Sequence, residues 1–398
     1  YAIGRMYQIA ESNDGALFYS DYQEIRQGKK IHHPTLEYQT GSIRNDFDFG
    51  QLLLFRNDSF QQVVAQMNTD YRFAALYELR LSISRLGKIV HIPETLYTVQ
   101  PTDLRLSGEK QFDYVDPANR EVQLEMEAVC TAHLQAIGAW LAPEFQRIDF
   151  GQENFAREAS VIIPVRNRKR TIAEAVESAL QQQTDFSFNV IVVDNHSTDS
   201  TGQILTELSR RYPNLIHHIP ASTELGIGGC WTEAILLPEC GKFAIQLDSD
   251  DLYKDCHVLQ RIVDTFYQEN CAMVIGSYQM VDFKLEEIPP GLIAHREWTP
   301  DNGRNNALRI NGLGAPRAFY TPVLRQIKFP NVSYGEDYAT ALAISRKYPI
   351  ARIYDPLYLC RRWEENSDHD LDIQQLNNYN FYKDKIRTLE IQARISGK

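Results

Sequence analysis

Three acidic residues stand close together where a strand should end. Asp248, Asp250 and Asp251 follow the largely apolar run of residues 243–247. Carboxylates clustered at the end of a buried strand repel one another, so a positive partner is expected beside them. Mg²⁺ and Mn²⁺ accept one or two carboxylates and take further oxygens from substrate phosphates. The spacing of Asp248 and Asp250 therefore predicts a metal site that holds a diphosphate, although the same residues could instead cap a helix.

The composition narrows the class of partner. The 398-residue chain carries a formal net charge of −11, which disfavours nucleic acid or an anionic membrane surface as the main partner. No apolar run approaches the roughly 18 residues that a membrane-spanning helix needs. The six cysteines form no CxxC pair, as is typical of reduced thiols in the cytoplasm. We therefore expect a cytoplasmic protein, compatible with peripheral association at the inner face of the membrane.

From residue 159 onward, apolar runs typical of strands buried on both faces alternate with segments of helical spacing. This alternation predicts an α/β fold with a mostly parallel sheet flanked by helices. Ligands of such sheets bind beyond the carboxyl ends of the strands, so residues 164–167, 194–197 and 248–251 should converge on one crevice. The predicted strands are residues 159–165, 188–194, 214–220, 242–248 and 271–278, and the predicted helices are residues 170–183, 201–212, 228–237 and 257–269.

The N-terminal part of the chain is similar in sequence to its C-terminal part, which indicates an internal repeat. Three segments align in the same order, namely residues 16–23 with 272–279, residues 50–55 with 314–319, and residues 74–98 with 335–359. The first copy has no counterpart of residues 159–256. A parallel sheet without its first strands would expose an edge, so we expect the missing half to precede Tyr1 in the natural protein.

The repeat and the α/β pattern together predict three parts. Residues 1–115 are a partial repeat that comprises the second half only. Residues 116–158 are a connector whose apolar positions form one helical stripe, as expected of an amphipathic helix packed between two lobes. Residues 159–398 are the domain that carries the acidic cluster.

A set of motifs in fixed order resembles the inverting family 2 glycosyltransferases of the GT-A fold. The resemblance covers roughly residues 159–365, and the repeat extends it to residues 1–98. The motifs are SVIIPVRNRKRTIAEAVESAL, VIVVDNHSTDST, GIGGCW, QLDSDD and GEDYATAL. The resemblance implies a nucleotide-sugar donor, Mg²⁺ or Mn²⁺ as cofactor, and a hydroxyl acceptor on a glycan or a lipid-linked glycan. It also implies a role in the synthesis of surface polysaccharide or glycolipid.

The resemblance also assigns roles to single residues. It places Asp248 near the ribose and the metal, Asp250 on the metal, and Asp337 as the base that takes the acceptor's proton, with Glu336 as the alternative. Many members carry a second Asp where this chain has Asn195. Because an amide oxygen still accepts the N3–H of uracil, we expect UDP. The predicted nucleotide-sugar-binding residues are Pro164, Arg166, Asn167, Asp194, Asn195, Gly228, Gly229, Asp248, Arg317 and Arg362, and the predicted metal ligands are Asp248, Asp250 and His369.

Several of these assignments have plainer alternatives. Gly228 and Gly229 could let backbone N–H groups approach a phosphate, or could simply form a tight turn. His369 could be a third metal ligand or a solvated loop histidine. Arg361, Arg362 and Trp363 are similar to the end of the QxxRW pattern of processive members, but Leu359 replaces the Gln, which disfavours a polymerase.

Two other functions compete with glycosyl transfer. The sugar-nucleotide pyrophosphorylases share this layout but need a basic, glycine-rich loop after the first strand, and residues 164–171 contain no glycine. A non-catalytic scaffold that binds sugar nucleotides or glycans would not need to keep its acidic residues. For residues 1–115 the non-catalytic alternative is favoured instead. Ala75 and Leu76 align there with Glu336 and Asp337, and neither can accept a proton.

Overall fold

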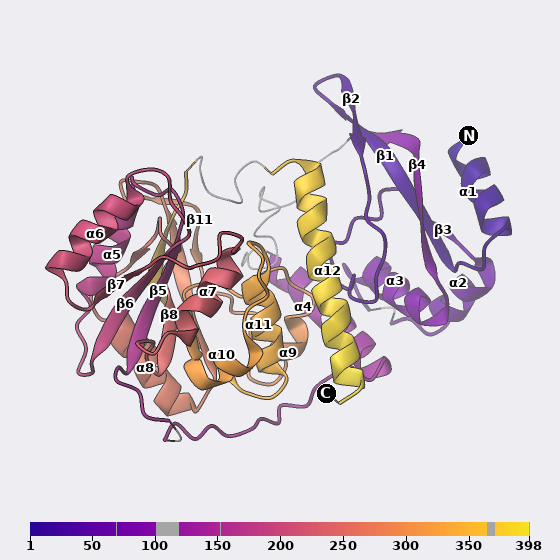
Figure 1. Ribbon diagram of the computed structural model, residues 1–398. Helices are drawn as coiled ribbons and strands as arrows, with labels where there is room; N and C mark the ends of the chain where they lie inside the picture. The colour runs from indigo at the N-terminus through magenta and orange to yellow at the C-terminus, as the bar shows by residue number, and fades with distance from the viewer. Residues whose placement is uncertain (69, 101–118, 152, 364–370, 398) are drawn as a thin grey trace. The chain divides into compact units, whose positions relative to one another are not determined.

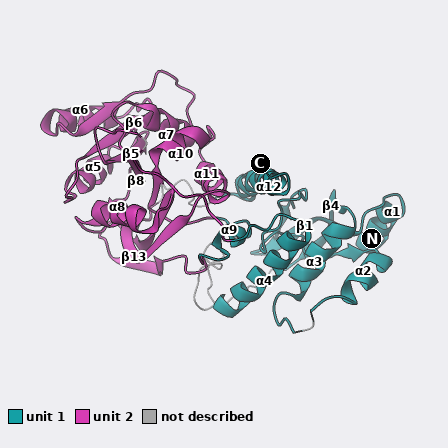
Figure 2. Cartoon of the chain, turned by 90° about the horizontal axis from the view of Figure 1, so that it is seen from below, with its two compact units in different colours: residues 1–142, 300–311, 370–398 teal, residues 143–299, 312–369 magenta. Residues whose placement is uncertain are grey.

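The computed structural model describes residues 1–68, 70–100, 119–151, 153–363 and 371–397, and Figure 1 labels its elements. The chain forms two compact units, coloured separately in Figure 2. Unit 1 comprises residues 1–142, 300–311 and 370–398, and unit 2 comprises residues 143–299 and 312–369. His369 and the predicted boundary near residue 115 lie outside the described residues.

Unit 2 is built on a mixed sheet. Its described strands follow the order β7–β6–β5–β8–β12–β10–β13–β9, with β11 paired to β10. The strands β7, β6, β5 and β8 run parallel to one another, whereas β12 runs antiparallel to both β8 and β10. The strands are β5 (Ala159–Val165), β6 (Phe188–Asp194), β7 (Leu215–His218), β8 (Phe243–Gln246), β9 (Leu252–Tyr253), β10 (Met273–Val281), β11 (Glu287–Ile293), β12 (Arg317–Tyr320) and β13 (Ile350–Arg361).

Helices cover this sheet, and in Figure 1 α5 and α6 lie beside β5, β6 and β7. The core is apolar and closed, since Val161 to Ile163 of β5 and Val190 to Val193 of β6 are all fully buried. The helices are α5 (Ile172–Leu180), α6 (Thr201–Arg211), α7 (Ile227–Leu236), α8 (Val258–Glu269), α10 (Thr321–Ile327) and α11 (Glu336–Ser345). The predicted α/β fold is confirmed, as is each helix and strand predicted between residues 159 and 281.

Unit 1 holds a smaller sheet centred on β1. Within the part of the chain that the structure describes, β1 pairs antiparallel with β2 and β3 and parallel with β4. The strands are β1 (Leu17–Arg26), β2 (Lys29–His33), β3 (Leu54–Phe55) and β4 (Ile89–Val99), and the helices are α1 (Ala2–Glu11), α2 (Asn57–Val64), α3 (Ala75–Leu86), α4 (Arg120–Ala136), α9 (Gly303–Asn306) and α12 (Ile373–Ile395).

Positions that align in the sequence repeat hold equivalent places in the two sheets. In each unit the central strand, β1 or β10, pairs parallel with a later strand and antiparallel with a short one. A register slip of one residue would abolish the agreement, because it turns every side chain to the other face. The equivalent pairs are Leu17–Ile89 with Met273–Ile350, Tyr22–Tyr97 with Tyr278–Tyr358, and Leu17–Phe55 with Met273–Phe319.

The two units do not follow the boundaries predicted from sequence. Residues 300–311 and 370–398, expected in the domain at 159–398, belong to unit 1. The predicted connector is divided, because α4 packs in unit 1 against α3 and α9 while residues 143–158 belong to unit 2. The sequence reading assumed that neighbouring residues share a domain, whereas the chain enters unit 1 three times.

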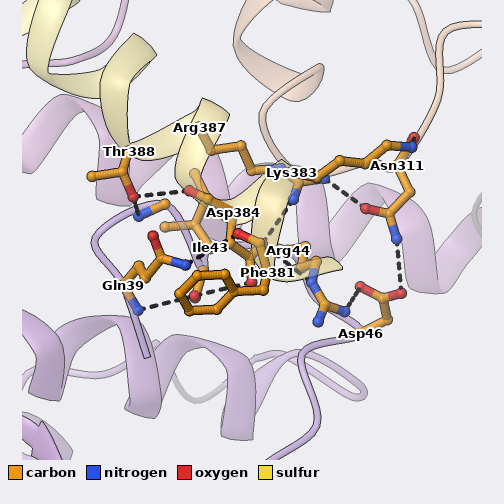
Figure 3. A network of polar contacts seen from close by, with 12 residues as sticks. Gln39, Ile43, Arg44, Asp46, Asn311, Phe381, Lys383, Asp384, Arg387 and Thr388 are labelled. Atoms are coloured by element: carbon orange, nitrogen blue, oxygen red, sulfur yellow. Dashed lines mark hydrogen bonds and ion pairs between the residues drawn. The ribbon is translucent and has the colours of Figure 1, made fainter. Parts of the chain in front are cut away.

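A buried polar network attaches α12 to the N-terminal part of unit 1 (Figure 3). Asp384 is fully buried and accepts hydrogen bonds from Arg387 at 2.8 Å and from Arg44 at 3.3 Å. Gly41 donates its N–H to the Thr388 hydroxyl at 2.8 Å, and a Cβ on Gly41 would collide with the backbone of α12. The contacts of Arg44 and Gly41 with α12 join residues more than 300 positions apart, which explains why no local pattern predicted the association.

Candidate active site

Gln246, the last residue of β8, links a candidate metal ligand to an arginine. Its side-chain oxygen accepts from the backbone N–H and the Nε of Arg317 at 3.1 and 3.0 Å, and its Nε2 donates to Asp248 at 2.9 Å. The Arg317 guanidinium also pairs with the Asp337 carboxylate. Asp248, Gln246, Arg317 and Asp337 are therefore joined in one chain of contacts. The sequence reading missed Gln246, although a buried amide inside an apolar strand was a visible signal.

Burial and mutual repulsion raise the pKa of two acids of the cluster, Asp248 and Asp251. Burial raises the pKa of Asp248, and Asp250 raises it further against the lowering effect of Arg317. Burial also raises the pKa of Asp251 well above its ordinary value, and so do the charges of Asp250 and Asp248. Asp251 accepts the backbone N–H of Arg361 at 2.8 Å. Asp251 is thus a structural acid, whereas Asp248 and Asp250 remain the candidate ligands.

An indole and a guanidinium contact the Asp250 carboxylate. The indole N–H of Trp363 donates to its carboxylate at 3.1 Å, and the Nε of Arg168 lies 3.8 Å from the same oxygen. The backbone carbonyl of Asp250 accepts a hydrogen bond from Arg361, whose guanidinium also pairs with Glu174. Arg168 and Trp363 were not among the predicted site residues, and only their basic and aromatic types beside known motifs could have indicated them.

Glu336 and Asp337 begin α11, directly after Gly335 with its positive φ of 80°. One carboxylate oxygen of Glu336 is buried and has no hydrogen-bond partner among the described residues. Burial, followed by the charge of Asp337, raises the pKa of Glu336 to about 8. At neutral pH Glu336 therefore keeps its proton, whereas Asp337 lies against a guanidinium that favours its ionised form.

The predicted glycines face protein rather than open space. A Cβ on Gly228 would stand 2.9 Å from the Cβ of Glu336 and would collide with Pro330, and one on Gly229 would collide with Asn331. The N–H of Gly228 is donated to the carbonyl of Val332 at 2.9 Å. These contacts give the two glycines a packing role, because they let residues 330–332 approach the start of α7.

Asn195 and Asp194 lie at the carboxyl end of β6. The Asn195 amide nitrogen donates to the carbonyl of Leu225 at 2.8 Å, and its side-chain oxygen is buried with no partner among the described residues. Burial would raise the pKa of Asp194, but hydrogen bonds from His217 and Ser197 outweigh it and lower that pKa. Asp194 is therefore ionised at neutral pH, beside an amide oxygen that is free to accept a hydrogen bond.

The remaining predicted residues occupy the edges of the site. Pro164 is half-buried in β5, opposite Val193 of β6, and Arg166 is exposed in the loop that follows. Asn167 accepts the backbone N–H of Thr198 at 2.7 Å and so joins the loops after β5 and β6. Arg362 donates its backbone N–H to Val281 at 2.9 Å. Of the predicted set, Arg317 and Asp337 are in direct contact, and Gln246 connects Asp248 to Arg317.

The described residues contain no group of three or more His, Cys, Asp and Glu arranged to hold a metal ion. The donor set nevertheless fits a hard cation. Asp248 and Asp250 stand one residue apart, and their mutual repulsion contributes to the raised pKa of Asp248. Mg²⁺ typically needs only one or two protein carboxylates, because substrate phosphates and water complete its shell.

Comparison with known proteins covers the segment that carries Asp248, Asp250 and Arg317, but not Asp337. Residues 160–327 match the family model described as glycosyl transferase family 2. A poly(ribitol-phosphate) beta-glucosyltransferase of Bacillus spizizenii is 25% identical over 56% of this chain and 35% of the relative. A minor teichoic acid biosynthesis protein of Bacillus subtilis is 33% identical over 27% of this chain and 24% of the relative. The matches span about a third or less of these curated relatives.

Solved structures resemble this chain only weakly in their backbone fold. TarS of S. aureus in complex with UDP-GlcNAc is 23% identical over 60% of this chain and 72% of that chain, with a TM-score of 0.46. A mannosyltransferase of Pyrobaculum calidifontis in complex with GDP-Man and Mn²⁺ is 15% identical over 72% of this chain and 86% of that chain, with a TM-score of 0.42. Both TM-scores are below 0.5. No helix within the described residues is both long enough and apolar enough to cross a membrane.

Proposed function

Since residues 160–327 match the family model of the family 2 glycosyltransferases, we propose that the chain transfers a sugar from a UDP-sugar to a hydroxyl group with inversion at the anomeric carbon. The observation that carries this proposal is the chain of contacts from Asp248 through Gln246 and Arg317 to Asp337. It joins an acid suited to the metal and donor with an acid suited to the acceptor. Both groups that a single displacement requires are therefore held by one rigid set of contacts.

The choice of UDP is supported by Asn195. Its side-chain oxygen is a buried acceptor with no partner among the described residues, and leaving such an acceptor unpaired costs about 1–3 kcal/mol. The N3–H of uracil is a donor that would satisfy it. Pro164, Arg166, Asn167 and Asp194 lie on the neighbouring strand ends and would complete the nucleoside pocket.

Asp337 is the better candidate for the base. A general base must be ionised when the acceptor hydroxyl arrives. Arg317 favours the ionised form of Asp337, whereas the pKa of Glu336 near 8 keeps that neighbour protonated at neutral pH. Glu336 would therefore donate a hydrogen bond to a substrate oxygen rather than accept a proton.

Asp248 and Asp250 would hold Mg²⁺ or Mn²⁺, with His369 as a possible third ligand outside the described residues. The bound metal would supply Lewis-acid stabilisation of the charge that develops on the departing diphosphate. Arg317 and Arg362 remain the proposed arginine partners of that diphosphate. Because Arg317 already contacts Asp337, it would orient the donor relative to the base.

We further propose an acceptor from the synthesis of cell-surface polymers. This rests on the names of two relatives, one acting on poly(ribitol phosphate) and one in teichoic acid synthesis. Such an acceptor, soluble or lipid-linked, would be met at the inner face of the membrane. The alternative, a non-catalytic scaffold, is less compatible with the paired Arg317 and Asp337.

For residues 1–98 we propose a second, partial copy of the same fold without chemistry. The matching strand registers support the copy. Helices α3 and α11 also begin at aligned residues, Ala75 and Glu336. Leu76, which aligns with Asp337, is 56% exposed and cannot accept a proton.

Nucleotide release tests the proposed function directly. The protein would be incubated with Mn²⁺ and a panel of UDP- and GDP-sugars, with and without ribitol-phosphate oligomers, and free nucleotide would be measured. Release that requires a UDP-sugar and rises with acceptor is expected. Binding of UDP-sugars with no release under any of these conditions would favour the scaffold.

A further inference from the structure

Arg170, in the loop after β5, has its guanidinium over two aromatic rings. Its guanidinium carbon lies 4.4 Å from the ring centre of Phe283 and 5.3 Å from that of Trp363. The two rings pack edge to face, with their centres 5.3 Å apart. Arg170 is exposed and has no acidic partner among the described residues. We call Arg170, Phe283 and Trp363 the arginine platform.

The neighbouring arginines differ from Arg170 in this respect. Arg168 also lies over Trp363, at 5.7 Å, but its Nε is 3.8 Å from Asp250. Arg361 lies 5.1 Å from the ring centre of Phe283, but it is buried and pairs with Glu174. Among Arg168, Arg170 and Arg361, Arg170 therefore differs in having no acidic partner among the described residues.

Ring contact fixes a guanidinium without using its in-plane N–H donors. Such a planar fork is suited to two parallel hydrogen bonds with a phosphate. The platform also adjoins the candidate metal site, because the indole N–H of Trp363 donates to Asp250 at 3.1 Å.

We propose that the arginine platform binds a phosphate group, and that this phosphate belongs to the acceptor. The inference rests on the proposed function, in which the acceptor is a polyol polymer that contains phosphate. The donor's diphosphate is expected at Asp248 and Asp250, with Arg317 and Arg362, whereas the ring contacts of Arg170 lie on Phe283 and Trp363. Arg170 would thus select a phosphorylated acceptor over a neutral polyol.

Calorimetric titration of the full chain with ribitol 5-phosphate, ribitol and UDP tests the proposal without requiring turnover. Arg170→Gln should weaken ribitol 5-phosphate binding about tenfold or more, since a charge-assisted hydrogen bond is lost. Arg170→Lys keeps the charge without the planar fork and should fall between wild type and Arg170→Gln. UDP affinity should stay unchanged in both variants.

Lys169→Gln is the matched control, because it removes the same charge from the adjacent exposed residue of the same loop. It should bind ribitol 5-phosphate as the wild type does. Equal weakening in Lys169→Gln and Arg170→Gln, or no weakening in either, would overturn the phosphate site. Weakened UDP binding with unchanged ribitol 5-phosphate binding would overturn its assignment to the acceptor.

The same experiment separates this inference from the proposed function. If the wild type binds ribitol 5-phosphate through Arg170 but releases no nucleotide from any donor, the proposed transfer is wrong and the phosphate site stands. If the wild type transfers sugar equally well to phosphorylated and neutral acceptors, and Arg170→Gln changes neither rate, the transfer stands and the phosphate site is wrong.

Discussion

The guanidinium of Arg317 is paired with the carboxylate of Asp337 in unit 2. Both side chains are largely buried, at 19% and 24% exposed, so the pair is screened less by solvent than a surface ion pair would be. Arg317 also contacts Gln246, which holds Asp248. The position of the candidate base is therefore linked to the strand end that carries the acidic cluster.

Asp337→Asn should cut sugar transfer by about 10²–10⁴-fold, the usual scale for the loss of a general base. UDP affinity should change little, because the amide keeps the shape of the side chain. Steady-state transfer rates and UDP calorimetry check the two parts. Near-normal turnover would show that Asp337 is not the base and would direct attention to Glu336→Gln.

Because we propose that residues 1–98 perform no chemistry, no residual metal-dependent transfer from unit 1 is expected in the Asp337→Asn protein.

Asp250→Asn should abolish the strengthening of UDP binding by Mn²⁺, because a neutral amide replaces a charged ligand. Calorimetric titration of UDP with and without Mn²⁺ measures this. Asp255→Asn is the control, since Asp255 makes an exposed ion pair with Arg261 in the same segment. Equal UDP affinity in the wild type under both conditions would remove the metal proposal.

Glu336→Gln should raise the melting temperature more at pH 9 than at pH 5. The pKa of Glu336 is about 8 in the folded protein against an ordinary 4.5. Between these values the unfolded chain ionises while the folded chain keeps its proton, so this residue lowers the wild-type stability as the pH rises from about 4.5 to 8. Glutamine has no such dependence. Scanning calorimetry should show a gap that widens by about 2 °C or more, and a gap that is constant with pH would contradict the buried, protonated Glu336.

Asp384→Asn should destabilise unit 1 by about 3–5 kcal/mol, because it leaves Arg44 and Arg387 buried without their shared carboxylate. Denaturant unfolding, read by circular dichroism, measures the loss. Asp14→Asn breaks the exposed ion pair with Lys88 and should change the stability little. If both variants unfold at the wild-type denaturant concentration, the network of Figure 3 does not hold α12.

The sequence predicted the parallel part of unit 2 well and unit 1 poorly. Residues 159–165 and 188–194 are largely apolar runs, and the observed β5 and β6 have the same bounds. By contrast, α12 buries Asp384 and Arg387 and exposes Phe381 and Leu389, at 43% and 57%. A prediction from hydrophobicity alone would therefore place the wrong face of this helix against the core. Its orientation depends on partners such as Arg44 and Gly41, more than 300 residues away, which no local pattern reveals.

Within the candidate site, the sequence could identify residue types but not their partners. Asp248 and Asp337 were recognised from their motifs, yet the amide that bridges toward them, Gln246, has no motif of its own. The same holds for the arginine platform, which joins the loop after β5 to Phe283 and to Trp363 beyond β13. Such arrangements arise only when the sheet brings distant strand ends together.

The threefold entry of the chain into unit 1 constrains the order in which the protein can assemble. Residues 1–100 are translated before unit 2, whereas the partners of Arg44 and Gly41 on α12 are translated after all of unit 2. Unit 1 therefore completes its packing after unit 2, although most of it is translated before unit 2. Contacts of such long sequence separation slow folding and prolong the exposure of unpaired strands. A nascent chain halted before residue 370 should thus hold a finished sheet in unit 2 beside an unfinished unit 1, and would be the form most dependent on chaperones.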